Sequence, residues 1–348
     1  MATIDIKSMT IEELGKTMKA LGEQPFKAKQ IYEWLHVKMV SNYDEMTNLS
    51  KALREKLNEQ YPLHQMTVVE YQESKIDGTR KYLLRQNDGS VIESVWMKYS
   101  HGNSVCISSQ VGCRMGCTFC ASTLGGLERN LSAAEMLEQI YVIQKDTGER
   151  VSNIVVMGTG EPLDNYETLV RFIKMVSDDN GLNISQRNIT VSTCGLVPQI
   201  YELAKEQLQI TLALSLHAPN DERRSELMPI AKKYKLAEVI KACRDYYNET
   251  KRRLTFEYSL AAGINDSAEE ARELASLLKG INCHVNLIPM NPVVERKYVQ
   301  SDKGNVVKFQ NKLEKYGINV TIRREMGRDI DGACGQLRYK AKASNTTH

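Results

Sequence analysis

Three cysteines within eight residues constrain this chain more than any other feature. Cys113, Cys117 and Cys120 follow a CxxxCxxC spacing inside residues 104–126, SVCISSQVGCRMGCTFCASTLGG. One loop can therefore bring three thiolates to a single inorganic centre. A structural zinc site takes four ligands in two close pairs, and a ferredoxin-type [4Fe-4S] cluster takes four cysteines. No fourth Cys or His follows at ligand spacing, so a cubane held here would keep one iron open.

The spacing, with Phe119 directly before the last cysteine, resembles the radical SAM superfamily. In that superfamily S-adenosylmethionine (SAM) binds the open iron through its amino and carboxylate groups. The resemblance implies a [4Fe-4S] cluster on Cys113, Cys117 and Cys120. The alternatives are a zinc site completed by a distant cysteine and chance clustering, although eight cysteines in 348 residues would rarely place three so close together.

Length and charge bound the class of protein. At 348 residues the chain exceeds the size at which a single core usually stops growing, so we expect a main domain and an appendage. The 46 basic and 43 acidic residues leave a net charge of +3, a weak indication of a polyanionic partner. The chain shows no signal peptide and no run of 18 apolar residues, so we expect a cytoplasmic protein that does not bind a membrane.

The first 98 residues predict a small helical module followed by β structure. Apolar residues recur at three- and four-residue spacing over 11–21, 26–37 and 50–61, and Thr10 and Ser50 are candidate N-caps. Three runs rich in β-formers follow, MTVVEY, RKYLLRQ and SVIESVWM. We expect this β element to join the helical module to the main domain.

From Ser104 onward, short apolar strands alternate with amphipathic helices. The predicted strands cover 104–108, 153–157, 188–192, 210–215, 254–259, 284–288 and 319–323. The predicted helices cover 132–145, 166–177, 236–247, 268–279 and 306–316. Such alternation predicts a parallel sheet in an α/β fold. Six βα units and a seventh strand are too few for a closed eight-fold barrel, so we favour a partial (β/α)6 TIM-like barrel over a flat doubly wound sheet.

Polar and glycine-rich segments follow the predicted strands, at the ends where active sites form in such sheets. In GTGEP, residues 158–162, Gly160 would let the backbone approach a ligand and Glu161 would suit the SAM ammonium group. Alone, this segment would read as a tight turn before a helix. Polar or backbone groups at other strand ends suit ribose and carboxylate contacts, or simple strand-terminating hydrogen bonds: Ser192, Ser215, Leu216, His217 and Asn291.

Six motifs extend the resemblance over nearly the whole chain. CISSQVGCRMGCTFCAS, MGTGEPLDN, LALSLHAPND, MPI, VNLIPMNP and DIDGACGQL are similar, in order, to the RlmN family of radical SAM RNA adenosine methyltransferases. The resemblance implies methylation of carbon 2 of an adenine in 23S rRNA near the peptidyl-transferase centre, and of the adenine 3′ of the anticodon in tRNAs. Cfr-like methylation of carbon 8 of the rRNA adenosine is the alternative. A non-catalytic, zinc-containing RNA-binding protein is the alternative from another class.

The resemblance also implies roles for residues outside the cluster. Cys334 takes a methyl group from one SAM, and a second SAM yields the radical that activates this methyl for addition to adenine. Cys106 then attacks the Cys334 sulfur in a transient disulfide that releases the methylated base. Glu93 accepts the ring proton. We expect the remaining cysteines to be small buried residues, namely Cys194, Cys243 and Cys283.

The resemblance completes the predicted organisation and partners. We expect a helical accessory domain that contacts RNA over 1–62, a β linker with Glu93 over 63–98, a radical SAM core over 99–327 and a C-terminal segment over 328–348. A flavodoxin-type one-electron reductant would serve a monomeric enzyme that extrudes its target adenine. Candidate phosphate contacts are the basic clusters Arg223-Arg224, Lys232-Lys233-Lys235, Lys251-Arg252-Arg253, Arg296-Lys297, Arg323-Arg324-Arg328 and Arg338-Lys340-Lys342.

Overall fold

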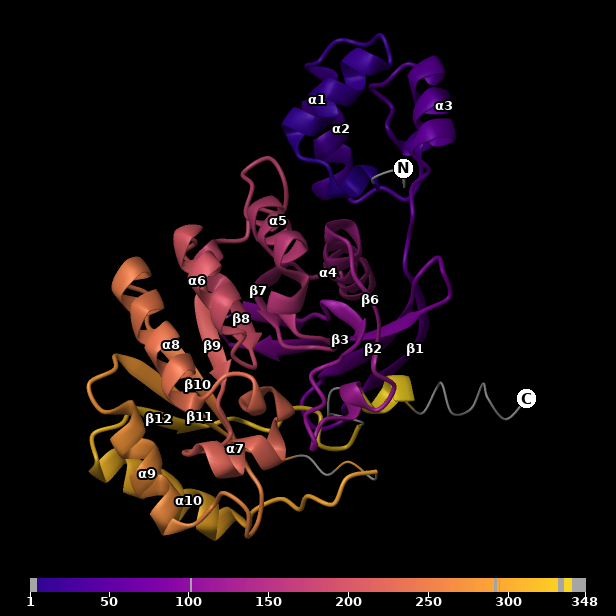
Figure 1. Ribbon diagram of the computed structural model, residues 1–348. Coiled ribbons are helices and arrows are strands. Elements are labelled where there is room, and N and C mark those ends of the chain that lie inside the picture. The colour runs from indigo at the N-terminus through magenta and orange to yellow at the C-terminus, as the bar shows by residue number, and fades with distance from the viewer. Residues whose placement is uncertain (1–4, 101, 291–292, 294, 331–334, 340–348) are drawn as a thin grey trace.

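The helical module lies at one end of the molecule (Figure 1). The computed structural model describes residues 5–100, 102–290, 293, 295–330 and 335–339. Thr10 forms a capping box at the start of α1, and Ser50 caps α3, as predicted. The module is anchored to helix α4 by a buried Lys7–Glu138 ion pair and by a 2.6 Å hydrogen bond between His36 Nδ1 and the Tyr141 hydroxyl. Its helices are α1 (Ile11–Ala20), α2 (Lys27–His36) and α3 (Lys51–Gln60).

One ten-stranded sheet runs through the rest of the molecule. Its strand order is β1-β2-β3-β4-β7-β8-β9-β10-β11-β12. The first four strands pair antiparallel, and every pair from β4 to β12 is parallel. The strands are β1 (Thr67–Glu73), β2 (Arg80–Arg85), β3 (Val91–Tyr99), β4 (Gly102–Cys106), β7 (Val151–Val156), β8 (Ile189–Thr193), β9 (Thr211–Ser215), β10 (Leu254–Leu260), β11 (Cys283–Pro289) and β12 (Val320–Ile322).

The parallel part of the sheet is a partial barrel. Its seven strands lie side by side in chain order, whereas a doubly wound sheet reverses direction at a switch point. Figure 1 shows the helices around the outside of this curved sheet. They are α4 (Ala133–Thr147), α5 (Tyr166–Val176), α6 (Val197–Lys205), α7 (Asp221–Leu227), α8 (Leu236–Thr250), α9 (Ala268–Leu278) and α10 (Lys303–Lys315). None of the described helices is long and apolar enough to cross a membrane.

Three elements were not predicted from the sequence. Helices α6 and α7 are short, with nine and seven residues. A separate two-stranded ribbon pairs β5 (Gln110–Gly112) with β6 (Leu127–Asn130) and brackets the cysteine loop.

The β1–β3 strands continue the main sheet through the β3–β4 pair. The four-part domain division stays a prediction.

Candidate active site

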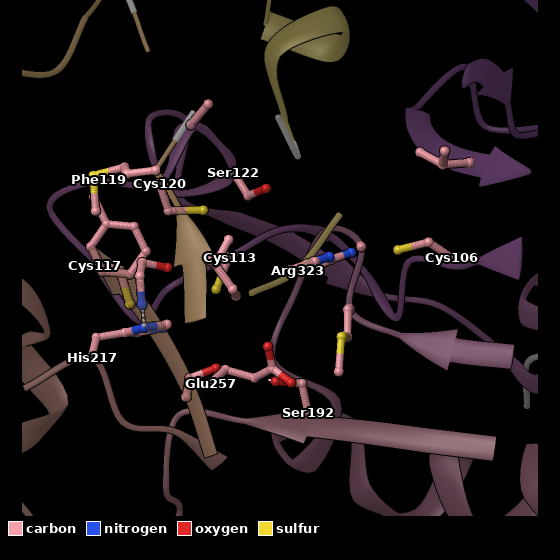
Figure 2. A pocket seen from close by; sticks show the side chains of 18 of the residues that line it. Cys106, Cys113, Cys117, Phe119, Cys120, Ser122, Ser192, His217, Glu257 and Arg323 are labelled. Atoms are coloured by element: carbon pink, nitrogen blue, oxygen red, sulfur yellow. Dashed lines mark hydrogen bonds between the residues drawn. The ribbon is translucent and has the colours of Figure 1, made fainter. Parts of the chain in front are cut away.

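A cavity of about 330 Å³ opens at the carboxyl ends of the parallel strands. Its lining comes from the cysteine loop, from the ends of β7 to β11, and from the residues after β12. Figure 2 shows the cluster cysteines on one side and Cys106 projecting from the opposite side. The predicted convergence of strand-end segments on one rim is therefore present among the described residues.

The cysteine loop is closed by tight backbone packing. Cys113 follows β5, and its N–H donates to the carbonyl of Gly126 over 2.9 Å. A Cβ on Gly112 would stand 1.9 Å from that same carbonyl oxygen, so only glycine permits this closure. The Thr123 hydroxyl then donates to the carbonyls of Cys117 and Cys120 over 3.1 and 2.9 Å. These contacts direct all three cysteines to the cavity.

The chemistry of the three thiols fits an iron–sulfur cluster. Burial raises the pKa of Cys113 to about 12, and burial with the neighbouring thiols raises the pKa of Cys117 above its ordinary value. Metal ligation requires thiolates, so these cysteines need a cationic centre among them. The described residues contain no group of three His, Cys, Asp or Glu side chains arranged to hold a single metal ion, either in this loop or elsewhere.

Glu161 provides a buried negative charge at the end of β7. Its Oε2 accepts the Cys194 N–H over 2.8 Å and its Oε1 accepts the Leu163 N–H over 3.1 Å. Burial raises its pKa, and the backbone donors oppose this effect. No Lys or Arg among the described residues lies within 4.0 Å of this carboxylate. Gly160 beside it also lines the cavity, and a Cβ there would meet Gln110 Cβ at 2.7 Å.

Four predicted SAM contacts lie at or directly after the carboxyl ends of β8 and β9. The hydroxyls of Ser192 and Ser215 lie 3.1 Å apart in the cavity wall. His217 has φ +56°, accepts the Ser259 N–H at Nδ1, and meets the Phe119 ring edge-on at 5.0 Å (Figure 2). Burial lowers its pKa to about 3, so the ring is a neutral acceptor. The Leu216 side chain is buried in the core and does not line the cavity. Asn291 lies outside the described residues.

Cys106 is the last residue of β4 and lines the cavity with 6% of its surface exposed. Two of the three cysteines predicted to be inert, Cys243 and Cys283, are buried in the core. Cys194 is buried as predicted but also lines the cavity.

Glu93 on β3 is buried and binds the C-terminal segment. Its Oε2 accepts the Gly335 N–H over 2.6 Å, and its Oε1 accepts the Arg338 N–H over 2.7 Å. Lys81 on β2 places its Nζ 3.1 Å from Oε2. Leu83 stands opposite Glu93 in the register, so Lys81 is its diagonal neighbour on the same face. Lys81 lines the cavity and Glu93 does not.

Both flanks of the segment 331–334 lie at the cavity. Ile330 lines it. Gly335 has φ +87°, and a Cβ there would stand 2.5 Å from the Ser122 backbone nitrogen, in the turn that follows Cys120. Asp329, which lies just before residues 331–334, accepts hydrogen bonds from the Ser74 hydroxyl and the Lys75 N–H. Cys334 itself lies outside the described residues.

Comparisons with known proteins identify the family. Residues 4–62 match the ribosomal RNA large subunit methyltransferase N-terminal domain, and residues 107–278 match the radical SAM superfamily. The probable dual-specificity RNA methyltransferase RlmN of Lachnoclostridium phytofermentans is 64% identical, covering 96% of this chain and 94% of that protein. The corresponding protein of Lachnospira eligens is 62% identical, covering 97% and 96%. The chain belongs to the RlmN family.

A solved structure agrees with this assignment. The crystal structure of a radical SAM methyltransferase from Sphaerobacter thermophilus is 44% identical, with a TM-score of 0.92, covering 95% of this chain and 98% of that chain. As an RlmN-family member with the radical SAM fold, the protein carries the cofactors of that superfamily, a [4Fe-4S] cluster and SAM.

Glu257 and Asn286 were not predicted from the sequence, and Arg323 was predicted only as a candidate phosphate contact, not as a neighbour of Glu257 in this RlmN-family cavity. Glu257 on β10 and Arg323 after β12 both line it (Figure 2). Asn286 on β11 donates to Glu257 Oε2 over 2.9 Å. Burial raises the pKa of Glu257, and Arg323 and Asn286 oppose that effect. A glutamate at the centre of the apolar run LTFEYSL was the available signal.

Two predicted phosphate contacts, Arg224 and Arg338, are wrong for this RlmN-family chain because their side chains are buried. Arg224 is fully buried. Arg338 is 5% exposed and pairs with Glu128. Arg296 donates to the Cys120 carbonyl over 3.1 Å and so supports the cysteine loop. A basic pair in sequence cannot reveal which of its members faces water.

Proposed function

We propose that this RlmN-family protein methylates carbon 2 of adenosine in 23S rRNA and of the adenosine 3′ of the anticodon in tRNAs. The observation that carries the proposal is one cavity that receives three cluster cysteines, Cys106 and Glu161, with both flanks of the segment 331–334 at its rim. The dual-specificity RNA methyltransferases at 53–64% identity support RNA as the substrate.

The target carbon explains why such a cavity is needed. Carbon 2 of adenine is electrophilic and its hydrogen is not acidic, so it cannot attack the SAM methyl group directly. When bound, the cluster and SAM would supply the one-electron chemistry that activates a methyl group for addition to this carbon. The protein must hold both cofactors, exclude water and bring the methyl carrier to the base.

The cofactor side of the cavity suits SAM. Cys113, Cys117 and Cys120 would hold the cluster and leave one iron open. Glu161, which is buried and has no basic partner among the described residues, would receive the ammonium group in a charge-assisted hydrogen bond. The remaining ribose and carboxylate contacts are proposed for Gly160, Ser192, Ser215, Leu216, His217 and Asn291.

Two cysteines would carry the methyl group and release the product. The Cys334 sulfur takes a methyl from the first of two SAM molecules, and the activated methylene adds to adenine. The Cys106 thiolate then attacks the Cys334 sulfur. A sulfur–sulfur bond forms while the sulfur–carbon bond to the nucleotide breaks. The electron pair of the broken bond stays with the carbon, which takes up a proton and becomes the methyl group of the product. The position of Cys106 in the cavity wall supports this role.

Glu93 is proposed to accept the proton that leaves carbon 2. In the described arrangement its oxygens already accept two backbone N–H groups and face Lys81. Proton acceptance therefore requires one of these contacts to open, and Lys81 is the member of the group that reaches the cavity. We propose that Glu93 also positions the C-terminal segment before the base arrives.

The remaining partners follow from the same chemistry. Arg323 and Arg324 line the cavity and suit the phosphates of an extruded nucleotide. We propose a monomer that works in the cytoplasm with a flavodoxin-type electron donor, where RNA and reduced thiols coexist.

The test is mass spectrometry of anaerobically reconstituted protein incubated with SAM, reductant and a 23S rRNA fragment. Wild type should yield a methylated Cys334 peptide and 2-methyladenosine. Cys106→Ala should accumulate a protein–RNA crosslink at Cys334, while Cys283→Ala, a buried thiol away from the cavity, should behave as wild type. An unmethylated Cys334 in a cluster-loaded protein would contradict the roles of both cysteines, and 8-methyladenosine would indicate the Cfr-like reaction.

A further inference from the structure

Arg224 on α7 is a buried cation that forms no ion pair with any described carboxylate. Its neighbour Arg223 is 40% exposed at the side chain and faces Glu226 and Glu270. Arg224 is 0% exposed. Its Nη2 donates to the Cys194 carbonyl over 2.6 Å and to the Ser215 carbonyl over 3.4 Å. Its Nε and Nη1 have no hydrogen-bond partner, and no described carboxylate forms an ion pair with it.

This arrangement is unfavourable unless a negative charge stands nearby. A guanidinium remains protonated at all ordinary pH values. Removing it from water is compensated only by a well-placed anion and by hydrogen bonds to its remaining donors. Two backbone carbonyls orient the group but neutralise no charge. Among the described residues Arg224 therefore has no carboxylate at ion-pair distance, and Asp221 on the same helix acts on it only from farther away.

The cysteine loop is the site from which that anion can come. The Thr118 N–H, directly after Cys117, donates to the Leu227 carbonyl in the last turn of α7 over 2.9 Å. The Thr118 hydroxyl lies 3.1 Å from the Glu226 carbonyl. Cys194, whose carbonyl Arg224 holds, lines the same cavity as Cys117. The loop that carries the cluster ligands is thus docked on the helix that carries Arg224.

The electrostatic coupling agrees with this geometry. Arg224 and the cysteine loop both contact the ends of β8 and β9, through the Cys194 and Ser215 carbonyls and through the cavity wall. The charge of Arg224 adds to the burial effect that lowers the pKa of His217, across the cavity wall. Burial lowers the pKa of Arg224, and Asp221 on the same helix is among the groups that oppose this effect. The field of the guanidinium therefore extends to the cluster side of the cavity.

We propose that Arg224 is the internal counter-charge of the iron–sulfur cluster and raises its reduction potential. Three thiolate ligands make the cluster site anionic, and the electron from an external one-electron donor adds a further negative charge. A fixed cation in a low-dielectric interior stabilises the reduced state more than the oxidised state. The inference rests on the proposed cluster, but not on the identity of the RNA or on methyl transfer.

The experiment is a potentiometric titration of the cluster followed by electron paramagnetic resonance, without SAM or RNA. Arg224→Met should lower the ratio of reduced to oxidised cluster about tenfold at a fixed potential, which corresponds to about 59 mV for one electron. Arg224→Lys, which keeps the charge, should stay close to wild type. Arg223→Met is the matched control and should also titrate like wild type, because its charge is screened by solvent.

Two results would overturn the proposal. One is an Arg224→Met cluster that titrates like wild type. The other is an Arg224→Lys shift as large as that of Arg224→Met, which would assign the effect to the lost hydrogen bonds and not to the charge. If the wild type assembles no cluster, the proposed function fails, and that outcome is distinct from either result.

Denaturant unfolding of the cluster-free full chain tests the same idea if Arg224→Met takes up no iron. An unpaired buried charge destabilises the cluster-free protein, so Arg224→Met should be as stable as wild type or more stable. A marked loss of stability would mean that Arg224 serves only to hold the ends of β8 and β9, and would overturn the proposal.

Discussion

Two buried glutamates, Glu161 in the cavity wall and Glu93 next to the cavity residue Lys81, have different electrostatic surroundings. Glu161, on the cofactor side, accepts two backbone N–H groups and has no basic side chain within 4.0 Å among the described residues. Glu93, on the β1–β3 side, also accepts two backbone N–H groups but faces Lys81 at 3.1 Å. The first carboxylate is left for an arriving cation. The second is already neutralised and holds the chain in place.

The two sides also differ in how far apart their contacts lie in sequence. Glu161 binds the backbone at Leu163 and at Cys194, 33 residues away, within neighbouring βα units. Glu93 reaches Gly335 and Arg338 across 242 and 245 residues. A motif at a strand end can organise the cofactor side, whereas the C-terminal segment depends on contacts made only after the whole sheet has formed.

Removing a cluster ligand is expected to have the largest effect and to act on the cofactor side alone. Cys117→Ser should lose the cluster and all methyl transfer, because two thiolates cannot hold the cubane. Iron content, visible absorbance and product analysis measure this. Cys283→Ser, a buried thiol outside the cavity, should keep both cluster and activity. A Cys117→Ser protein with full iron content would break the assignment of the cofactor side.

Breaking the buried Lys81–Glu93 ion pair should mainly lower the free energy of unfolding. Lys81→Met leaves the Glu93 carboxylate buried and unpaired, which should cost about 3–5 kcal/mol of unfolding free energy. Lys98→Met, in the exposed pair with Glu149, should cost about 0–1 kcal/mol. Adding Glu93→Leu to Lys81→Met should recover much of the loss. Equal costs for Lys81→Met and Lys98→Met in denaturant unfolding would show that Glu93 is not neutralised as described.

Substitutions of the two glutamates should have different effects on SAM affinity. In cluster-loaded protein, Glu161→Gln should weaken SAM binding roughly 10- to 100-fold, since a charge-assisted hydrogen bond of about 1.5–3 kcal/mol is lost. Glu93→Gln should leave SAM affinity unchanged and reduce methyl transfer. Equilibrium dialysis with labelled SAM and a methylation assay measure the two quantities. A Glu93→Gln protein that binds SAM as weakly as Glu161→Gln would remove the distinction between the two sides.

The smallest effect concerns the helical module that packs beside the β1–β3 side. His36 is buried against Tyr141 at the contact with α4, and burial, with the nearby Lys7 charge, lowers its pKa to about 3. The unfolded value is near 6.5. The stabilising contribution of neutral His36 is therefore complete above pH 6.5 and is lost as the pH falls toward 3.

His36 should accordingly lower the free energy of unfolding by up to about 1.4 kcal/mol over the first pH unit below 6.5. His36→Gln, which can still bond the Tyr141 hydroxyl, should remove this part of the pH dependence. Denaturant unfolding at a series of pH values measures it. An unchanged slope in the variant would show that the module is docked by other contacts, such as Lys7–Glu138.

Local patterns were sufficient for the cofactor side. The seven parallel strands, the cysteine loop and Glu161 were all predicted, because period-two apolar runs and glycine-rich strand ends carry their structural information within a few residues. The ribbon β5–β6 was missed because strands of three and four residues are too short to show a period. Helices α6 and α7, at nine and seven residues, present only two turns each.

What the sequence alone determined is the order of strands, the cysteine loop and the family. What only the tertiary structure decided is the environment of individual charges: Arg224 inside while Arg223 faces water, and Glu93 paired with Lys81 and bound to a segment more than 240 residues away. The physical reason is that a charged residue in a short pattern looks the same whether solvated or buried. Its partners come from distant parts of the chain, and their identity is settled only when the sheet, the loops and the C-terminal segment pack together.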